Sequence, residues 1–565
     1  MAHLTNKIDP YDEELNTPNV FKINGTLYYS FFEISDQPER PKNAEDDLTP
    51  RTNVIRLTKS AIISLDIFEN FFEPFCSGQI TINNPFDFIE DNHYTQGNGQ
   101  DYLHVTLYEW AQGREDAERS DNTLRKAGSK LQNKKLEYTF VLTNEGNSIS
   151  KSDRSNNFKT YSLLDKNYAK LNETVPYGKR YPTDEMKEKS KDYPAGDLSV
   201  GNIIKQVLID ALGPNNEEGN STINEKLWDP GNHNIGENNG EFAPLQEYII
   251  PPLQWKYSDL LKYLLRINYS LGGEGEKLPV QSVLQFDRVT KQYSLLPINW
   301  YFQNNTDLVI EGFGVGDLTG NPDNVPPDES STGTNKNNPR SGTKKNPIPV
   351  NIYEGMLKNT NLITPMLTYG NEFFVNYSVG FRDPITGIEG QTQVSIADII
   401  DGWKRAFVDP FKLVGGPAEM FLPLSKENEH NVRPMIFPFG EKQCINLAKA
   451  QMVSNLTFFN LQLTLDNEGN TNRQPGKFID VFKLLGSTVA NDTPSDAKLL
   501  GRWFVTGIHH RFIKDSYENI IQCIKTYIGP DLDIRSNPGE QNGRNRELDL
   551  DFLSNSGSRG PAGAP

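Results

Sequence analysis

SLDIFENFFEPFCSGQITI, residues 64–82, is the most informative segment of the sequence. It overlaps two apolar runs, residues 61–68 and 78–82, which have the length of β-strands. Asn, Pro and Gly, which favour turns and interrupt regular structure, bound these runs. The pattern therefore predicts two strands that follow each other closely along the chain.

The same pattern continues beyond this stretch. Three further apolar runs of strand length occupy residues 102–110, 136–143 and 160–164. The polar, charge-rich residues 113–135 separate two of these runs and predict a long hairpin loop. We therefore predict a β module over residues 54–175. Residues 1–53 are mostly polar and predict an extended arm, within which residues 25–34 form one added strand.

A small helical module is predicted at residues 176–275. Val200, Ile203, Ile204 and Val207 recur at helical spacing, and the helix should end at Gly213 because Pro214 follows it. A second helix is predicted over residues 259–268, with Ser258 as its N-cap.

Strands return in residues 276–313, where a hairpin is predicted from residues 283–286 and 293–296. Two further short strands are expected at residues 300–302 and 308–310. Residues 314–345 contain almost no apolar side chains and predict a flexible linker or loop.

The last part of the chain again reads as a packed structure. Residues 346–440 predict a mixed α+β inserted domain with a helix at residues 396–407. Residues 441–530 predict a second β module that starts with a helix at residues 442–453. Its strands are expected at residues 456–465, 478–482, 503–508 and 520–528. Residues 531–565 are rich in Gly, Asn, Arg and Asp, and a disordered tail is expected there.

The composition agrees with a folded, strand-rich chain. The 565 residues allow roughly three or four domains. Hydrophobic residues make up 36% of the chain, and its 30 Phe and 23 Tyr favour β-structure. The first 20 residues have no apolar core, and no uncharged apolar run approaches the ~18 residues that span a bilayer. We therefore expect no secretory signal and no membrane insertion.

The formal net charge of −17 argues against a protein that grips nucleic acid, because phosphate binding needs a basic surface. The charge is compatible with nucleic acid that slides past. An acidic wall repels the phosphate backbone over about 8–10 Å at moderate salt.

Cofactor and metal sites are not indicated. The three cysteines, Cys76, Cys444 and Cys523, are an odd number without C-x-x-C spacing, so buried free thiols are expected. No segment has the spacing of a calcium loop. We expect no cofactor and no metal.

Catalytic motifs are equally missing from the sequence. None of the seven histidines forms an H-E-x-x-H motif, and the sequence has neither a phosphate-binding loop nor a nucleophile elbow. His509 and His510 are adjacent in a predicted strand, so their side chains should point to opposite faces and cannot share a metal. The spacing of the carboxylates selects no acid–base pair. An enzyme is therefore not expected.

Residues 64–82 resemble the opening of the first tube-like domain in central baseplate hub proteins of contractile-tailed bacteriophages, which are related to the hub part of secretion-system spike proteins. In that family a strand, an acidic-aromatic bend and a G-x-I-x-I strand recur. Residues 251–269 look like the inserted helical domain of the family, and residues 284–296 look like the strand pair that follows it. Residues 461–528 look like the second tube-like domain.

Six residues serve as the structural fingerprint of this resemblance: Gly78, Pro475, Gly476, Asp480, Gly501 and Trp503. Pro475 and Gly476 form a tight-turn dipeptide that should send the chain back as the strand at residues 478–482. Gly501 should open a strand in which Trp503, Val505 and Gly507 face one way.

The resemblance implies a fold that is mainly β with α+β insertions. Two tube-like β-barrel or sandwich domains and a small helical domain would make up each subunit. Three subunits would then form a ring of pseudo-sixfold symmetry that adapts the sixfold tail tube to a threefold central spike.

The implied partners are two further copies of the chain in a homotrimer, the tail tube protein, the central spike protein and other baseplate subunits. Genome DNA would pass through the lumen without specific binding, and an acidic lumen would keep it from sticking. The implied location is the tail baseplate of the virion, after assembly in the host cytoplasm. Two alternatives stay open: a tail-associated cell-wall hydrolase, and a receptor-binding tail module.

Overall fold

A computed structural model of the chain describes residues 19–23, 26–35, 38, 54–57, 61–83, 101–111, 135–148, 158–184, 199–216, 219–228, 241–242, 249–272, 278–288, 290–303, 348–351, 357–363, 376–383, 386–395, 398–407, 432–437, 439–458, 461–469, 471, 473–482, 501–513 and 516–526.

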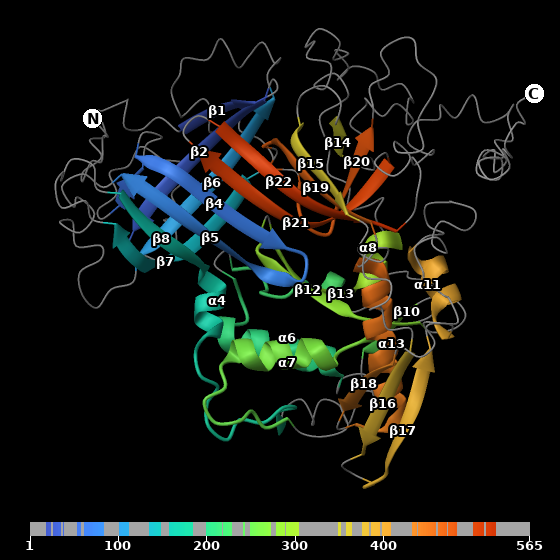
Figure 1. Ribbon diagram of the computed structural model, residues 1–565. Coiled ribbons are helices and arrows are strands. Elements are labelled where there is room, and N and C mark those ends of the chain that lie inside the picture. The colour runs from blue at the N-terminus through green and yellow to red at the C-terminus, as the bar shows by residue number, and fades with distance from the viewer. Residues whose placement is uncertain are drawn as a thin grey trace, which may run out of the picture.

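These residues are mostly β, and their main feature is one large, mainly antiparallel sheet of 14 strands (Figure 1). Its N-terminal strand group consists of β1 (Asn19–Ile23), β2 (Thr26–Ser35), β3 (Val54–Arg56), β4 (Ile62–Asn70), β5 (Glu73–Asn83), β6 (Tyr102–Ala111), β7 (Lys135–Ser148) and β8 (Phe158–Asp165). Its C-terminal strand group consists of β14 (Ile348–Asn351), β15 (Leu357–Ile363), β19 (Leu461–Glu468), β20 (Phe478–Phe482), β21 (Gly501–Ile513) and β22 (Ser516–Lys525).

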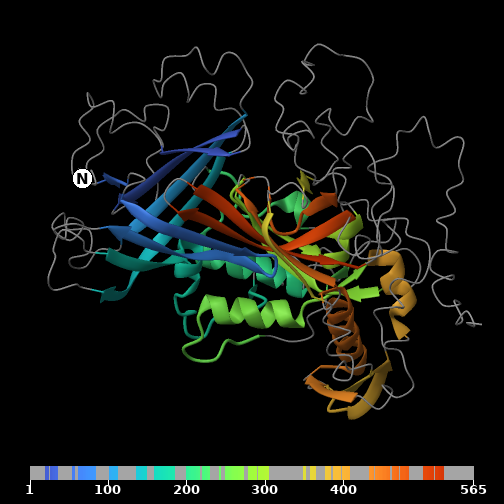
Figure 2. The same cartoon turned by 45° about the horizontal axis from the view of Figure 1, so that its top comes forward.

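The strand order shows how the two groups join. The main path runs β1-β2-β6-β7-β8-β5-β4-β21-β22-β19-β15, while β3 pairs with β2, and β20 pairs with β21 and β14. The junction is the antiparallel pair of β4 and β21, whose register runs from Gly507 opposite Asn70 to Phe512 opposite Leu65. Strands from the two ends of the chain therefore share one sheet (Figure 2).

The strands predicted at residues 61–68, 78–82, 102–110, 136–143 and 160–164 are confirmed as β4 to β8. The strand expected within residues 25–34 is also confirmed, because β2 pairs with β6 along its whole length. The expected hairpin loop at residues 113–135 lies almost wholly outside the described residues. The antiparallel pairing of β6 with β7 places the two ends of that segment at the same end of the strand pair.

Two buried clusters of apolar side chains fill the two strand groups, and each cluster includes side chains from the other group. The cluster of the N-terminal group contains Phe512 and Tyr517 from the connected ends of β21 and β22. The cluster of the C-terminal group contains Phe71 from the turn between β4 and β5. The two cores are therefore interlocked by these hairpin ends.

A helical region lies beside the sheet (Figure 1) and has its own apolar core. It contains α4 (Lys166–Leu171), α6 (Val200–Leu212), the 3-10 helix η3 (Glu225–Leu227) and α7 (Tyr257–Ile267). The prediction of α6 is confirmed: the Ser199 hydroxyl accepts from the backbone N–H of Asn202, and Gly213 follows the helix with φ +94°.

The predicted start of α7 is wrong by two residues. Ser258 lies inside the first turn, and its hydroxyl donates to Asn172 Oδ1 over 3.2 Å. Lys256 is the N-cap residue, and its backbone N–H donates to the Asp259 carboxylate over 3.2 Å. The sequence favoured Ser258 because serine is a common N-cap, but its side chain bonds to a neighbouring segment instead.

The hairpin predicted after the helical region is confirmed as β12 (Ser282–Asp287) and β13 (Gln292–Pro297), with Phe286 opposite Tyr293. A small sheet of β9 (Glu241–Phe242), β10 (Ser270–Gly272) and β11 (Leu278–Val280) precedes it.

The strand predicted at residues 300–302 is wrong, because these residues belong to the helix α8 (Ile298–Gln303). Trp300, Tyr301 and Phe302 are all buried in the core of the C-terminal group. A short apolar run buried on all sides cannot be assigned to strand or helix by its periodicity. The strand expected at residues 308–310 and the linker at residues 314–345 lie outside the described residues.

Between residues 346 and 440 the structure has both helix and strands. A sheet of β16 (Asn376–Arg382), β17 (Glu389–Ser395) and β18 (Val432–Phe437) packs beside α13, and α11 (Ile400–Phe407) begins four residues later than predicted. β14 and β15 come from the same part of the sequence but pair with β20 and β19 of the large sheet. Helix α13 (Glu441–Phe458) extends five residues beyond the predicted end, so β19 begins at Leu461 and not at residue 456.

Candidate functional site

Of the fingerprint residues, Gly78 allows a close approach of two strands. It lies on β5 opposite Ile67 of β4. A Cβ atom at this position would collide with the backbone carbonyl oxygen of Asp66. Glycine is therefore required here by space and not by backbone conformation.

The Pro475–Gly476 turn is confirmed. The N–H of Lys477 donates to the carbonyl oxygen of Gln474 over 3.3 Å, and Gly476 has φ +82°, as the third position of a type II turn requires. The N–H of Gly476 also donates to Val505 O over 2.9 Å. A Cβ at Gly476 would lie 3.2 Å from the ring of Phe71, so the turn also sits against the interlocking hairpin end.

The other three fingerprint residues lie on paired strands. Asp480 is opposite Arg502, and Gly501 opens β21 opposite Val481. Trp503 is fully buried, and the Lys525 ammonium lies 5.4 Å from its ring centroid. The six residues thus stabilise turns and strand pairs and do not converge on one site.

The expected alternation of Trp503, Val505 and Gly507 is wrong. Val505 is opposite Cys523, yet Gly507 is opposite Gln522, so Thr506 forms a β-bulge. A bulge shifts the alternation of side chains by one residue. Ile508, His510 and Phe512 therefore take the buried positions beyond it.

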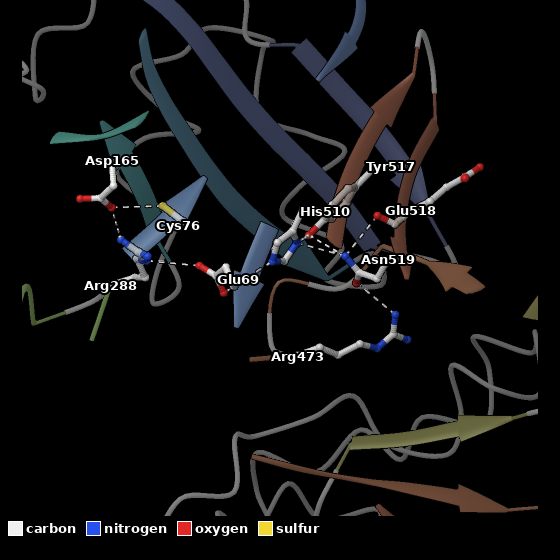
Figure 3. A network of polar contacts seen from close by, with 9 residues as sticks. All are labelled: Glu69, Cys76, Asp165, Arg288, Arg473, His510, Tyr517, Glu518 and Asn519. Carbon is white, nitrogen blue, oxygen red and sulfur yellow. Dashed lines mark hydrogen bonds and ion pairs between the residues drawn. The ribbon is translucent and has the colours of Figure 1, made fainter. Parts of the chain in front are cut away.

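The polar centre of the described structure is a buried network that the sequence did not indicate (Figure 3). Arg288 follows β12 and reaches into the N-terminal strand group. Its Nε lies 3.2 Å from Glu69 Oε1 on β4, and its Nη1 lies 3.2 Å from Asp165 Oδ2 at the end of β8. The guanidinium also lies over the rings of Tyr138 and Phe286, at 5.3 and 5.0 Å from their centroids.

This burial makes the charges of the network interdependent. The side chains of Arg288, Glu69 and Asp165 are only 10%, 8% and 7% exposed. Burial alone would raise the pKa of Glu69, but the facing His510 imidazole and the charge of Arg288 outweigh it. The pKa of Glu69 falls from 4.5 to about 2. Glu69 is therefore ionised and paired at neutral pH.

Asp165 connects the network to the helical region. One carboxylate oxygen, Oδ2, accepts from Arg288 and from the Cys76 thiol, whose sulfur lies 3.2 Å away. The other, Oδ1, accepts the backbone N–H of Asn167 over 2.9 Å and so caps α4. Burial raises the pKa of Cys76 well above its usual value, so the thiol is a neutral donor and no nucleophile.

The network continues to the C-terminal strand group through His510. Arg473 Nη1 donates to Asn519 Oδ1 over 3.1 Å, which turns the Asn519 amide nitrogen toward His510 Nδ1 at 3.0 Å. Because the amide nitrogen can only donate, His510 Nδ1 must accept, and the Tyr517 hydroxyl lies 2.8 Å from the same atom.

It follows that the neutral imidazole of His510 carries its proton on Nε2. That nitrogen faces Glu69 Oε2 at 3.9 Å. The prediction for the histidine pair is confirmed, since His510 is fully buried while His509 faces outward and its Nε2 lies 2.7 Å from Asp66 Oδ1.

Chemically, this arrangement holds elements together. Arg288 connects the hairpin β12–β13 to β4 and β8, and His510 connects β4 to β21 and β22. Lys291 of the same hairpin adds an ion pair of 2.7 Å with Glu137 on β7. Among the described residues, no group of three His, Cys, Asp or Glu side chains is placed to hold a metal ion. No described helix is both long and apolar enough to cross a membrane.

No protein-family model matches the sequence, and no curated protein matches it significantly. Solved structures do show similarity to the chain. A tail protein from Neisseria meningitidis MC58 is 9% identical, with a TM-score of 0.40 over 88% of this chain and 96% of that one. The 43 kDa tail protein of prophage MuSo2 from Shewanella oneidensis is 8% identical, with a TM-score of 0.41 over 88% and 98%.

A chain in the half-lidded PdpA-VgrG complex of Francisella is 10% identical, with a TM-score of 0.39. The similarity covers 91% of this chain and 60% of that chain. The similarity to these two tail proteins and to this chain of a PdpA-VgrG complex extends over most of the length of the chain.

Proposed function

We propose that this chain is a structural hub subunit of the baseplate in a phage contractile tail. Three copies form a ring with pseudo-sixfold symmetry, which joins the sixfold tail tube to the threefold central spike. The partners are the tube protein, the spike protein and other baseplate subunits. DNA passes through the lumen of the ring without specific binding, and the protein resides in the virion.

The observation that carries this proposal is the pairing of β4 with β21. It joins two strand groups from opposite ends of the chain into one sheet, and each group has its own core. If each group acts as one tube-like domain, three subunits supply six such domains around an axis. This is the number that a sixfold tube requires.

The buried network supports a role of this junction in transmitting force. Arg288, Glu69 and His510 connect the hairpin β12–β13, the N-terminal group and the C-terminal group at one place. A ring subunit that transmits force between a tube and a spike needs its domains fixed relative to one another. The described carboxylates of the network are engaged in these contacts, which favours structure over catalysis.

Light scattering and electron microscopy test the proposal. The purified chain should give particles of three times the mass of one chain that form a ring with an open centre. Mixed with the tube and spike proteins of the same phage, it should give heavier complexes that contain three copies of the chain. A chain that stays monomeric under all these conditions, and binds neither partner, would contradict the hub assignment.

One observation favours a second candidate, a receptor-binding tail module. Tyr177, Ile250 and Leu253 are 90%, 67% and 73% exposed in the helical region, which is unusual for apolar side chains of this size. Binding of the chain to surface glycans of a host on a glycan array, lost in a Tyr177→Ser variant, would support that function. Absence of binding leaves the hub as the better account.

A further inference from the structure

Four buried polar side chains form a group apart from the Arg288 network. Asn268, Ser270 and Asn299 are fully buried, and Ser282 is 5% exposed. Both amide atoms of each asparagine and both serine hydroxyl oxygens have no hydrogen-bond partner among the described residues.

The backbone brings these four positions to one place. Asn268 directly follows α7, two residues before Ser270, which is opposite Val280 in the pair of β10 and β11. Gln281 then leads into β12, where Ser282 is opposite Pro297. The N–H of Ile298 donates to Gln281 O over 2.9 Å, and Asn299 comes next in α8.

The surroundings of the group exclude bulk solvent. Val280, Val283 and Ile298, which lie one or two residues from Ser282 or Asn299 along the chain, are buried members of the core of the C-terminal strand group. The β10–β11 sheet is further covered by α13, where Asn446 Nδ2 donates to Tyr269 OH over 3.2 Å. More than nine in ten buried polar groups in proteins have a partner. Six buried polar atoms without a partner in the described part of the chain, in four neighbouring residues, therefore indicate a bound small molecule that supplies the hydrogen bonds.

We propose that Asn268, Ser270, Ser282 and Asn299 form a binding site for internal water molecules between β10, β12 and α8. The four side chains are uncharged, which disfavours an ion. Together they offer amide N–H donors, carbonyl acceptors and hydroxyls that do both, and a water molecule typically makes about three hydrogen bonds in such surroundings. The waters complete the junction between the helical region and the core of the C-terminal group.

The direct test uses the unaltered protein. A crystal or electron-microscopy structure at a resolution that shows ordered water should contain water density within hydrogen-bond distance, about 2.7–3.2 Å, of the Asn268 and Asn299 amides. Well-ordered maps with these amides in contact only with apolar atoms, or bonded to protein groups, would overturn the proposal.

Substitution of the two asparagines gives a second test. Stability should change in one direction if the amides hold water and in the other if they are unpaired. Asn268→Leu and Asn299→Leu keep the branching of the asparagine side chain at Cγ and remove its polar atoms. If the amides hold water, each change leaves the water and the serines short of partners, and the urea midpoint of unfolding should fall. If the amides are unpaired, the same changes remove a buried polar group without loss, and the midpoint should rise.

Water relaxation dispersion counts long-lived internal waters and supplies the matched control. The Asn268→Leu/Asn299→Leu double variant should retain fewer such waters than the wild type. Thr457→Val is the control, because the buried Thr457 hydroxyl bonds directly to protein, to Val453 O and Trp403 Nε1. It should lose stability with no change in the water count. An unchanged number of long-lived internal waters in the double variant would contradict the proposed water site.

Discussion

The backbone N–H of Phe71 donates a hydrogen bond to the carbonyl oxygen of Thr506 over 2.7 Å, where the turn between β4 and β5 meets the β-bulge of β21. The ring of Phe71 enters the core of the C-terminal strand group, with its centroid 4.9 Å from that of Phe504 and 5.0 Å from that of Tyr301. The bulge and the inserted ring thus form one contact region, here called the joint, which fixes the two strand groups to each other.

Replacing Phe71 by Ala should weaken this joint strongly. Truncation of a fully buried Phe typically destabilises a protein by about 3–5 kcal/mol. Because Phe71 belongs to the core of the other group, both groups should unfold in one transition at a lower denaturant concentration. Phe72→Ala is the control, since Phe72 is 43% exposed and should give a much smaller effect. Equal effects of both changes would mean that Phe71 does not hold the groups together.

Arg288→Met should lower the free energy of unfolding far more than the loss of a surface ion pair does. It leaves Glu69 and Asp165 buried without their cation, and breaking a buried pair in this way costs about 3–5 kcal/mol. Arg180→Met is the matched control, because Arg180 pairs with Asp184 at the surface, where the side chains are 49% and 71% exposed. That change should cost at most about 1 kcal/mol. Chemical denaturation of the wild type and of the two variants measures both losses of stability.

Stability should fall in acid because of Glu69. Its pKa is about 2 in the folded chain, against 4.5 as the ordinary value, so the unfolded chain binds the proton first as the pH drops. The contribution of Glu69 is complete above pH 4.5 and disappears as the pH falls through 2. The shift corresponds to about 3 kcal/mol. Glu69→Gln should be less stable at pH 7 and show a flatter decline between pH 5 and pH 2; a slope equal to the wild type would refute the assignment.

His510 should be an Nε2–H tautomer when neutral. Selective ¹⁵N labelling of histidine measures this, because the protonated and unprotonated ring nitrogens differ in chemical shift. His509, which faces Asp66 on the outside of the sheet, is the internal comparison. Asn519→Asp replaces the amide donor by an acceptor, so a proton should then be held at His510 Nδ1. A wild-type spectrum with the proton on Nδ1 would contradict the orientation of Asn519.

The features that could be predicted from the sequence are those that depend on residues close together along the chain. The apolar runs that form β4 to β8 were predicted from their length and bounding residues. Helix α6 was predicted from the helical spacing of its apolar residues and from Gly213. The Pro475–Gly476 turn likewise depends on local backbone preferences, and its type II geometry agrees with them.

The buried network depends on contacts that no local pattern encodes. Arg288 and Glu69 are 219 residues apart. The pair of His509 and Asp66 on the outside of the sheet is equally non-local, at a separation of 443 residues. Arg288 follows a hairpin strand, where an exposed charge is the usual expectation. The bulge at Thr506 and the helix α8 were missed for a related reason: both are imposed by packing against distant segments, which overrides the alternation of the residues themselves.

The interlocked hairpin ends also constrain how the chain is made. The core of the N-terminal strand group includes Phe512 and Tyr517, which are synthesised more than 340 residues after β8 ends at Asp165. During translation this core lacks part of its apolar side chains until Phe512 and Tyr517 have left the ribosome. The final folding step is therefore a late, long-range closure, and pairings between distant segments are intrinsically slow. Until then the edge of β4 that β21 will occupy is open to other strands, including those of nascent neighbours.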